Sequence, residues 1–419
     1  MSDRADQARC RRGRIALAAV GVVALLAASC SSSSDANAKP KTPTSAATRP
    51  STSAIPGPSS VATPPGVAPV VNPVNLYSET GPGKLSAAVK GDLPRVYVPN
   101  RADSSVSVID PATMKVIDTF PVGLYPQHIV PSWDLQTLWV TNNAEGTDQG
   151  SVTPIDPRTG KAGEPIKVED PYNMYFTPDG KSAIVVAEAL HRLDFRDPHT
   201  MQMQSSIDVP GCDGVNHADF TIDSRFVIFT CEFNGGLVKV DLTKKAVAGY
   251  LKLSGQDGMP QDIRSSPDGR IFYVADMMAG GVYLIDPTAF TETGFVPTGI
   301  GTHGLYPSRD GKQLYIANRG SNHVAGNTPH NPGSVSVLDF ATGKVVANWP
   351  IPAGGSPDMG NVSVDGSRLW LSGRYDNEVY SINTKDGSVV KIPVGSEPHG
   401  LTVWPQPGRY SLGHTGNMR

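Results

Sequence analysis

Short apolar segments, each followed by an aspartate at a turn, recur along the chain beyond residue 80. The recurring positions are Asp134, Asp179, Asp223, Asp268, Asp310 and Asp365. They are 45, 44, 45, 42 and 55 residues apart, and the longest step contains an insertion at residues 319–333. A repeat of this length predicts a tandem array of one structural unit.

A second type of apolar segment, such as VSVID and VSVLD, ends in Asp or Asn and occurs seven times. Its last residues are Asp110, Asp156, Asp197, Asp241, Asp286, Asp339 and Asn383. A side chain of this kind accepts a hydrogen bond from the backbone two residues further on and starts a turn. Each unit thus contains four short strands. Four strands per unit of about 44 residues predict a β-propeller rather than a β-solenoid, whose coils are usually shorter.

The inner strands of the units do not match the other strands in number. Six are expected inside the array, at 126–131, 171–176, 216–221, 260–265, 302–306 and 357–362, whereas the other three types form seven sets, the first at 95–122. The unassigned strand at 398–404, in SEPHGLTVWP, supplies the seventh. We therefore expect an all-β, seven-bladed propeller with four-stranded blades, closed by the C-terminal strand joining the first blade, which leaves no free sheet edge between blades.

The segments YVPN, WVTN, YVAD and YIAN, each followed by a strand such as VSVID, carry a family resemblance. The chain resembles the YVTN-family (surface-layer or YncE-like) seven-bladed propellers of bacterial envelope proteins over residues 80–405. The resemblance implies the fold but no particular chemistry, because related propellers include binding proteins, lactonase-like and streptogramin-lyase-like enzymes, and the copper domain of nitrous oxide reductase.

The N-terminus has the pattern of an export signal. Arg11, Arg12 and Arg14 precede an apolar run at 15–28 that is short for a membrane span. Small residues before Cys30 resemble a bacterial lipoprotein box, so we expect a signal peptide at 1–29 and lipidation of Cys30. The protein would then be exported and anchored to the outer face of the cell membrane. The alternative is ordinary cleavage and secretion.

Two further segments flank the predicted propeller of residues 80–405. Residues 30–79 are rich in Ser, Thr, Pro and Ala, which predicts a disordered tether. Residues 406–419 form a C-terminal tail. With Cys10 in the signal and Cys30 lipidated, only Cys212 and Cys231 remain, and an oxidising compartment favours a disulfide between them.

Charge excludes one class of partner. The whole chain has a net charge of −3, and removal of residues 1–29 takes away five arginines and two aspartates, which leaves −6. Nucleic-acid binding depends on a surplus of Lys and Arg that neutralises phosphates, so we expect no nucleic-acid partner.

A polar position recurs near the start of every inner strand, where the strands surround one mouth of the channel. Seven residues before each turn aspartate, and at the matching place in the closing strand, stand Gln127, Tyr172, Asn216, Gln261, His303, Asp358 and His399. This regularity in otherwise apolar strands predicts a ligand-binding ring. The alternative is a ring of polar side chains and waters that fills the channel.

Four histidines fall near the same mouth: His128, His217, His303 and His399. Imidazoles from separate blades are able to hold a transition metal such as Cu or Zn. These four occupy two adjacent strand positions, which normally face opposite sides, so their convergence requires a bulge at the start of the strand. Charged and amide residues at the ends of the second strands, among them Glu188, Glu232, Arg319 and Arg374, are interpreted as turn caps or supports of the imidazoles.

These features favour a lipid-anchored, monomeric binding or interaction scaffold of the bacterial cell envelope, with a ligand at the channel mouth. Its partner would be an envelope protein, a glycan or a small ligand. The alternative is a metal-dependent enzyme of lyase, lactonase or oxidase type that uses the channel-mouth histidines. The sequence contains no G-x-S-x-G or P-loop motif, and it leaves open whether the protein is an enzyme.

Overall fold

A computed structural model describes residues 61–323 and 331–407. The predicted signal peptide, Cys30, the first part of the tether and residues 408–419 lie outside the described residues. None of the helices in the described ranges has the length and hydropathy needed to cross a bilayer.

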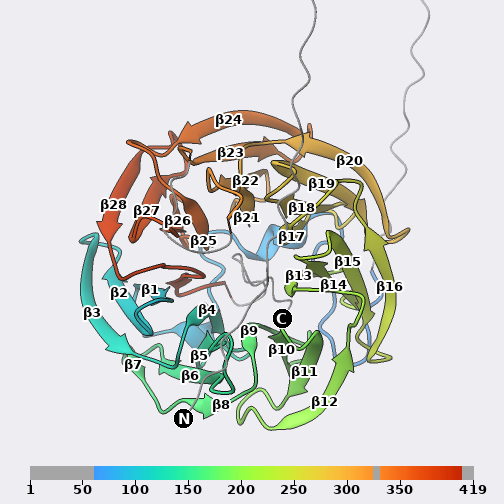
Figure 1. Ribbon diagram of the computed structural model, residues 1–419, viewed down its shortest axis with the longest axis horizontal. Coiled ribbons are helices and arrows are strands. Elements are labelled where there is room, and N and C mark those ends of the chain that lie inside the picture. Colours follow the sequence, from blue (N-terminus) through green and yellow to red (C-terminus); the bar gives the residue numbers. More distant parts are fainter. Residues whose placement is uncertain (1–60, 324–330, 408–419) are drawn as a thin grey trace, which may run out of the picture. The chain divides into compact units, whose positions relative to one another are not determined.

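Seven antiparallel sheets, or blades, surround a central channel (Figure 1). The inner strands of blades one to seven are β29 (Thr402–Trp404), β4 (Pro126–Pro131), β9 (Pro171–Phe176), β13 (Val215–Phe220), β17 (Pro260–Ser265), β21 (Thr302–Pro307) and β25 (Pro357–Val362). The second strands are β1 (Arg95–Asn100), β5 (Leu138–Asn142), β10 (Ala183–Ala187), β14 (Phe226–Cys231), β18 (Phe272–Asp276), β22 (Gln313–Asn318) and β26 (Arg368–Gly373). Both sets confirm the predicted order within a blade.

The remaining strands form the outer half of each blade. The third strands are β2 (Ser105–Asp110), β6 (Ser151–Asp156), β11 (Arg192–Arg196), β15 (Gly236–Asp241), β19 (Gly281–Asp286), β23 (Ser334–Asp339) and β27 (Glu378–Asn383). The outer strands are β3 (Lys115–Pro121), β12 (Met203–Asp208), β16 (Ala246–Lys252), β20 (Thr291–Pro297), β24 (Lys344–Pro350) and β28 (Val389–Pro393). In blade two the outer strand is split into β7 (Lys161–Ala162) and β8 (Ile166–Lys167), both paired with β6.

The C-terminal strand closes the ring, as predicted. β29 pairs with β1 in antiparallel register, with Arg95 opposite Trp404 and Tyr97 opposite Thr402. The indole of Trp404 also donates a hydrogen bond to Asp92 over 2.9 Å. The first blade is therefore built from the two ends of the folded chain.

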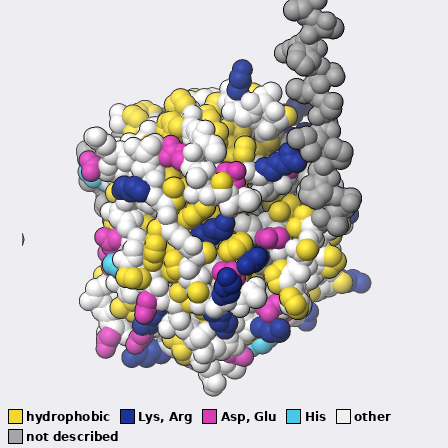
Figure 2. Space-filling model, turned by 90° about the vertical axis from the view of Figure 1, so that its right-hand side faces the viewer, with side chains coloured by type: hydrophobic (Ala, Val, Ile, Leu, Met, Phe, Trp, Pro, Cys, Tyr) yellow, Lys and Arg dark blue, Asp and Glu magenta, His cyan; other side chains and the backbone are white. Residues whose placement is uncertain are grey.

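Burial explains why the strands stack in this order. Every residue of β13 and β17 is buried, because inner strands are covered by the neighbouring blades on both faces. The outer strands β16 and β20 instead alternate between exposed and half-buried residues. On the side of the ring shown in Figure 2, basic, acidic and apolar side chains are interspersed.

The recurring aspartates make the turns that the sequence predicts. In six blades a Ser or Thr hydroxyl donates to the carboxylate of the turn aspartate, as Ser266 does to Asp268 over 2.7 Å. The same carboxylate accepts the backbone N–H two residues on, such as that of Arg270. The face that carries these six turns is called the lower face, and the opposite one the upper face.

The predicted disulfide is present. Cys212 and Cys231 are bonded, with their Cα atoms 4.8 Å apart. Val215 at the start of β13 stands opposite Cys231 in β14, which brings Cys212 within reach. The bond therefore fixes the connection between blades three and four beside the upper face.

The segment before the first blade crosses the lower face and contains two short 3-10 helices, η1 (Leu76–Glu79) and η2 (Ala87–Val89). The Tyr77 hydroxyl donates to the carbonyl of Ser265, and the Leu76 N–H to that of Pro267, each over 2.7 Å. In the view of Figure 1 this blue segment passes behind the ring. Residues 61–79 belong to the predicted tether, and the structure places them against the propeller.

Candidate ligand-binding site at the channel mouth

Two rings of side chains surround a cavity of about 230 Å³ at the upper mouth of the channel. The first ring comes from the starts of the inner strands, and five of its seven predicted members line the cavity: Gln127, Tyr172, Gln261, His303 and His399. The other two lie behind it. Asn216 donates a hydrogen bond to Glu232, and Asp358 binds His399, so each orients a residue of the lining.

A bulge at the start of the inner strands turns two successive side chains toward the channel. The pairing register shifts there in β4, β9, β13, β17, β21 and β25. Because the extra residue loses its ladder partner, another group must accept its N–H. Thr141 accepts the N–H of His128, and Thr230 that of His217, each over 3.1 Å. This is the bulge that convergence of the four histidines requires.

The four histidines do lie together. Their ring centroids form a circuit, in which His128 and His399 are 4.8 Å apart, His128 and His217 5.2 Å, His217 and His303 6.3 Å, and His303 and His399 6.2 Å. Yet within residues 61–323 and 331–407 no three or more His, Cys, Asp or Glu side chains have an arrangement able to hold a metal ion. Metal binding by the four histidines stays a prediction.

His128 and His217 form the floor of the cavity. Both are fully buried and do not line its surface. A glycine neighbour makes room for one of them, because a Cβ on Gly400 would stand 2.0 Å from Nδ1 of His128.

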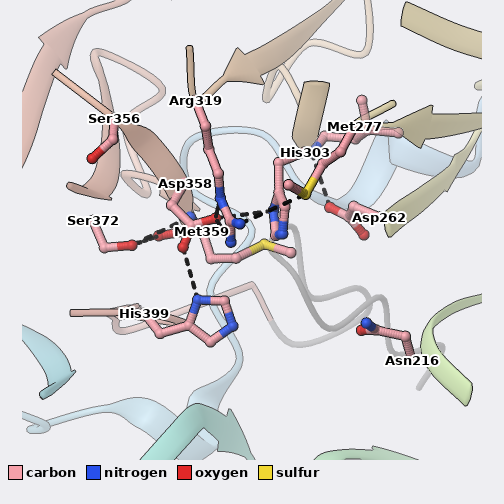
Figure 3. Close-up of polar contacts among 12 residues, drawn as sticks. Asn216, Asp262, Met277, His303, Arg319, Ser356, Asp358, Met359, Ser372 and His399 are labelled. Atoms are coloured by element: carbon pink, nitrogen blue, oxygen red, sulfur yellow. Dashed lines mark hydrogen bonds and ion pairs between the residues drawn. The ribbon is translucent and has the colours of Figure 1, made fainter. Parts of the chain in front are cut away.

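The carboxylate of Asp358 organises one side of the site (Figure 3). Arg319 donates to its Oδ1 from Nε over 2.8 Å and from Nη2 over 2.7 Å, and Nδ1 of His303 lies 3.0 Å from the same oxygen. Nδ1 of His399 lies 2.8 Å from Oδ2. Burial acts to raise the pKa of Asp358, but Arg319 and the two imidazoles outweigh it and hold that pKa well below its usual range.

The two imidazoles are neutral at neutral pH. Burial and then Arg319 lower the pKa of His303 to about 4. Burial, followed by Arg374, lowers the pKa of His399 well below its usual value. With Asp358 ionised, Nδ1 of His399 carries the proton, and Nε2 is an acceptor that lies 3.5 Å from the Tyr172 hydroxyl. His399 thus presents a lone pair on the cavity side.

The second ring consists of the residue that follows each second strand. From blade one to blade seven its members are Arg101, Asn143, Glu188, Glu232, Met277, Arg319 and Arg374. All but Met277 line the cavity. The three arginines come from the adjacent blades six, seven and one, and the two glutamates from the adjacent blades three and four. The ring is therefore positive on one arc and negative on the other.

The three arginines differ in their partners. Arg319 binds Asp358, and Arg101 binds Glu397 over 2.8 Å as well as Glu145. Arg374 is buried, and neither its Nε nor its Nη1 has a hydrogen-bond partner. Burial lowers the pKa of its guanidinium. Arg374 is the cation of this arc that no acidic side chain neutralises directly.

The glutamates of the opposite arc oppose each other's ionisation. Burial and then the charge of Glu232 raise the pKa of Glu188 well above its usual value. Burial also raises the pKa of Glu232, although it accepts a hydrogen bond from Asn216. A cation placed between the two carboxylates would relieve both effects.

The sequence interpretation named Glu188, Glu232, Arg319 and Arg374 at the second-strand ends, and all four line the cavity. Asn100, Asn142 and Asn318 serve their own blades; for example, Asn100 donates to Ser107 over 2.9 Å. The residue after each of them faces the mouth instead. An alignment of that following residue over all seven blades would have shown the two charged arcs. The insertion at residues 319–333 begins with Arg319. The Tyr375 hydroxyl donates a hydrogen bond to the carbonyl of His323 in this insertion. His330 lies outside the described residues.

Comparisons with known proteins agree with this architecture. No curated protein matches the sequence. Among solved structures, hydrazine synthase from Kuenenia stuttgartiensis has a TM-score of 0.55 at 19% identity and covers 69% of this chain and 92% of its own. The dihydro-heme d1 dehydrogenase NirN in complex with DHE has a TM-score of 0.54 at 14% identity, with 77% of both chains covered.

A functionally unknown protein from Desulfotomaculum acetoxidans has a TM-score of 0.58 at 15% identity, and covers 74% of this chain and 98% of its own. Likeness at these identities shows the fold and not the chemistry. The family model described as YNCE-like beta-propeller matches residues 59–407. The chain belongs to the YncE-like β-propeller family.

Proposed function

We propose that this protein is an exported, lipid-anchored binding protein of the bacterial cell envelope, which holds a small polar ligand at the upper mouth of its propeller. The observation that carries the proposal is Arg374, a buried guanidinium on the cavity wall that none of the described carboxylates binds. A buried charge without a partner costs several kcal/mol. A residue that served only to fill the channel would not need that charge.

The shape of the cavity supports a binding role. His128 and His217 lie buried beneath it, and the segment with η1 and η2 crosses the lower face, so we expect a ligand to enter from the upper mouth. Its volume of about 230 Å³ is below the range of drug-sized pockets. A macromolecular partner would therefore insert only one end, and a small molecule fits as a whole.

Export is supported by the disulfide. Cytosolic proteins rarely keep such bonds, whereas proteins beyond the membrane commonly do. Substitution of Cys30→Ala should move the protein from the membrane fraction to the soluble fraction of the cells that produce it. Retention in the membrane would contradict lipid anchoring.

Purification of the protein from its native envelope, followed by mass spectrometry of the small molecules released on denaturation, tests the binding role. We expect one compound in stoichiometric amount, and its loss in Arg374→Met. The matched control is Arg270→Met, on the lower face, whose side chain is 64% exposed. Absence of any enriched compound, or equal recovery from both variants, would contradict the proposal.

A second candidate function is an enzyme of lyase or lactonase type, favoured by the pairing of Asp358 with His399. A carboxylate that holds Nδ1 of an imidazole orients Nε2 for proton transfer, and Tyr172 lies beside that nitrogen. Elemental analysis of protein from its native compartment tests the metal-dependent version. Absence of a stoichiometric metal, with unchanged ligand recovery in the double variant His128→Ala and His217→Ala, would exclude it.

A further inference from the structure

The two charged arcs of the second ring specify more than a polar ligand. We infer that the ligand is a small amino acid–like zwitterion, whose carboxylate binds Arg374 and whose ammonium group lies between Glu188 and Glu232. This inference rests on the proposed binding function and names the chemical class of its ligand.

The anion has one guanidinium available. Arg319 already gives Nε and Nη2 to Asp358, and Arg101 is held by Glu397 and Glu145. Arg374 lines the cavity and forms no ion pair with a carboxylate of the described residues. A guanidinium that no carboxylate holds is a charge-assisted donor for the carboxylate of a ligand. The neighbouring arginines add positive potential without competing for the same bond.

The ammonium group of the ligand would face the carboxylates of Glu188 and Glu232, on the arc opposite the arginines. None of the described residues donates a hydrogen bond to the Glu188 carboxylate, whereas Gln261 and Asn216 both donate to Glu232. An ammonium group carries three donors in a compact form. It would satisfy both glutamates and remove the repulsion between them.

Uncharged residues of the second ring lie between the two arcs on both sides. Asn143 of blade two and Met277 of blade five separate the glutamates from the arginines on either side. Tyr172 lines the same cavity as the residues of both arcs. Its hydroxyl is therefore within reach of a ligand that spans the cavity.

Ligands with a single charge fit this ring less well. A simple anion would bind Arg374 and leave the two glutamates facing each other. A simple amine would compensate the glutamates and leave Arg374 buried without a partner. A molecule with both charges satisfies both arcs, and the volume of about 230 Å³ limits it to the size of a free amino acid or a comparable amino carboxylate.

The substituent of such a ligand has a path out of the cavity. Asn143, Glu145, Glu188 and Phe233 line both this cavity and an adjoining groove of about 620 Å³. Phe233 is 51% exposed and Leu190 47% exposed in that groove, so apolar surface adjoins the ring on the glutamate side. A side chain attached near the ammonium group would leave the cavity over Phe233.

Isothermal titration calorimetry on the mature protein tests the inference, with the common amino acids as probes. For the best binder, the corresponding amine without a carboxylate and the corresponding acid without an ammonium group are titrated as well. Loss of one partner of a buried charge pair typically costs 2–5 kcal/mol. We therefore expect each single-charge analogue to bind at least about 30-fold more weakly than the amino acid.

Two variants assign the charges to their residues. Arg374→Met should weaken the amino acid at least about 30-fold and leave the amine nearly unaffected, whereas Glu188→Gln should weaken the amino acid and leave the acid nearly unaffected. Arg270→Met is the control and should behave like the natural protein. Equal binding of an amino acid and its single-charge analogues would overturn the inference.

The outcomes also separate this inference from the proposed function. If the compound released from the envelope-purified protein carries only one type of charge, the binding function holds and the zwitterion is wrong. If no compound is released and none of the amino acids binds, both are wrong.

Discussion

The two ends of the channel contain the same chemical group in opposite circumstances. Arg309 near the lower face and Arg374 at the upper mouth are 3% and 4% exposed. Arg309 donates to the carbonyls of Ser363 and Val362 and to the side-chain oxygen of Gln406, and only Nη1 is left without a partner. The chain itself binds the lower guanidinium, whereas the upper one has two unpaired nitrogens. Burial alone thus does not distinguish the two arginines, whereas the number of their satisfied donors does.

The largest expected effect on stability comes from deletion of β29, the strand that runs from the upper mouth to the lower face. β29 follows His399 at the upper mouth and leads to Gln406 beside Arg309. The buried side chains of Leu401, just before β29, and of Val403 and Trp404 within it are each worth about 2–5 kcal/mol in a packed core. Their sum approaches the total stability of a typical domain. We expect that deletion of residues 396–419 abolishes the cooperative thermal transition.

Differential scanning calorimetry measures this effect. A chain that ends after Pro407 keeps every contact described for β29 and is the control. If the shorter deletion and the longer one melted alike, closure by β29 would not stabilise the ring.

A fall in pH should lower the free energy of unfolding through His303 at the upper mouth. The folded pKa of His303 is about 4, below the usual value of 6.5, because burial disfavours its charged form. A depressed folded pKa means that the stabilisation is complete above pH 6.5 and is lost as the pH falls toward 4. The linkage relation gives a loss of about 2 kcal/mol from this group by pH 5.

Urea unfolding at pH 7.5 and pH 5 measures the loss. Wild type should lose about 2 kcal/mol more than His303→Gln over this interval. His199→Gln, whose side chain is 69% exposed, should behave like wild type. Equal losses in wild type and His303→Gln would contradict the assigned burial effect.

The smallest effect is the sharpest test of the comparison, because its sign differs between the two ends. Arg309→Met leaves several buried acceptors without a donor and should lower the free energy of unfolding by about 2 kcal/mol. Arg374→Met removes an uncompensated buried charge and should raise that free energy by about 1 kcal/mol in the ligand-free protein. Urea unfolding of both variants at pH 7.5 measures this, and effects of the same sign would remove the distinction between the two ends.

The repeats made most of the fold predictable. The expected inner strands at 126–131 and 171–176 match β4 and β9, because the spacing of the turn aspartates fixes where each strand ends. The pairing of the C-terminal strand with the first blade followed from counting strands. Repetition thus supplied for this chain the information that an alignment of relatives usually supplies.

The site was predictable in part. The ring that includes His303 and His399 could be found because its polar residues interrupt apolar strands at a constant distance from a turn. The bulges could not, since they depend on hydroxyl partners such as Thr141 in the next strand. Arg374 and Glu188 were interpreted as turn caps or supports of the imidazoles, because the two arcs appear only when the blades are placed in a circle.

The N-terminal segment shows the limit of composition. Residues 61–79 fall within the segment whose Ser, Thr, Pro and Ala content predicted a disordered tether, but they contain only one Ser and one Thr and as many as five Val. Leu76 and Tyr77 are buried against blades three and four and donate hydrogen bonds to blade five. The pattern of single residues matters there more than the average.

The covered lower face has a consequence for the exchange of bound molecules. With His128 and His217 buried beneath the cavity and the segment around Tyr77 on the lower face, we expect a ligand to enter and leave on the upper side alone. A second molecule is unable to enter from behind and displace the first. Release should therefore follow a single rate constant that does not rise with the concentration of competing ligand. The exchange of one ligand for another should be limited by the rate at which the bound molecule leaves.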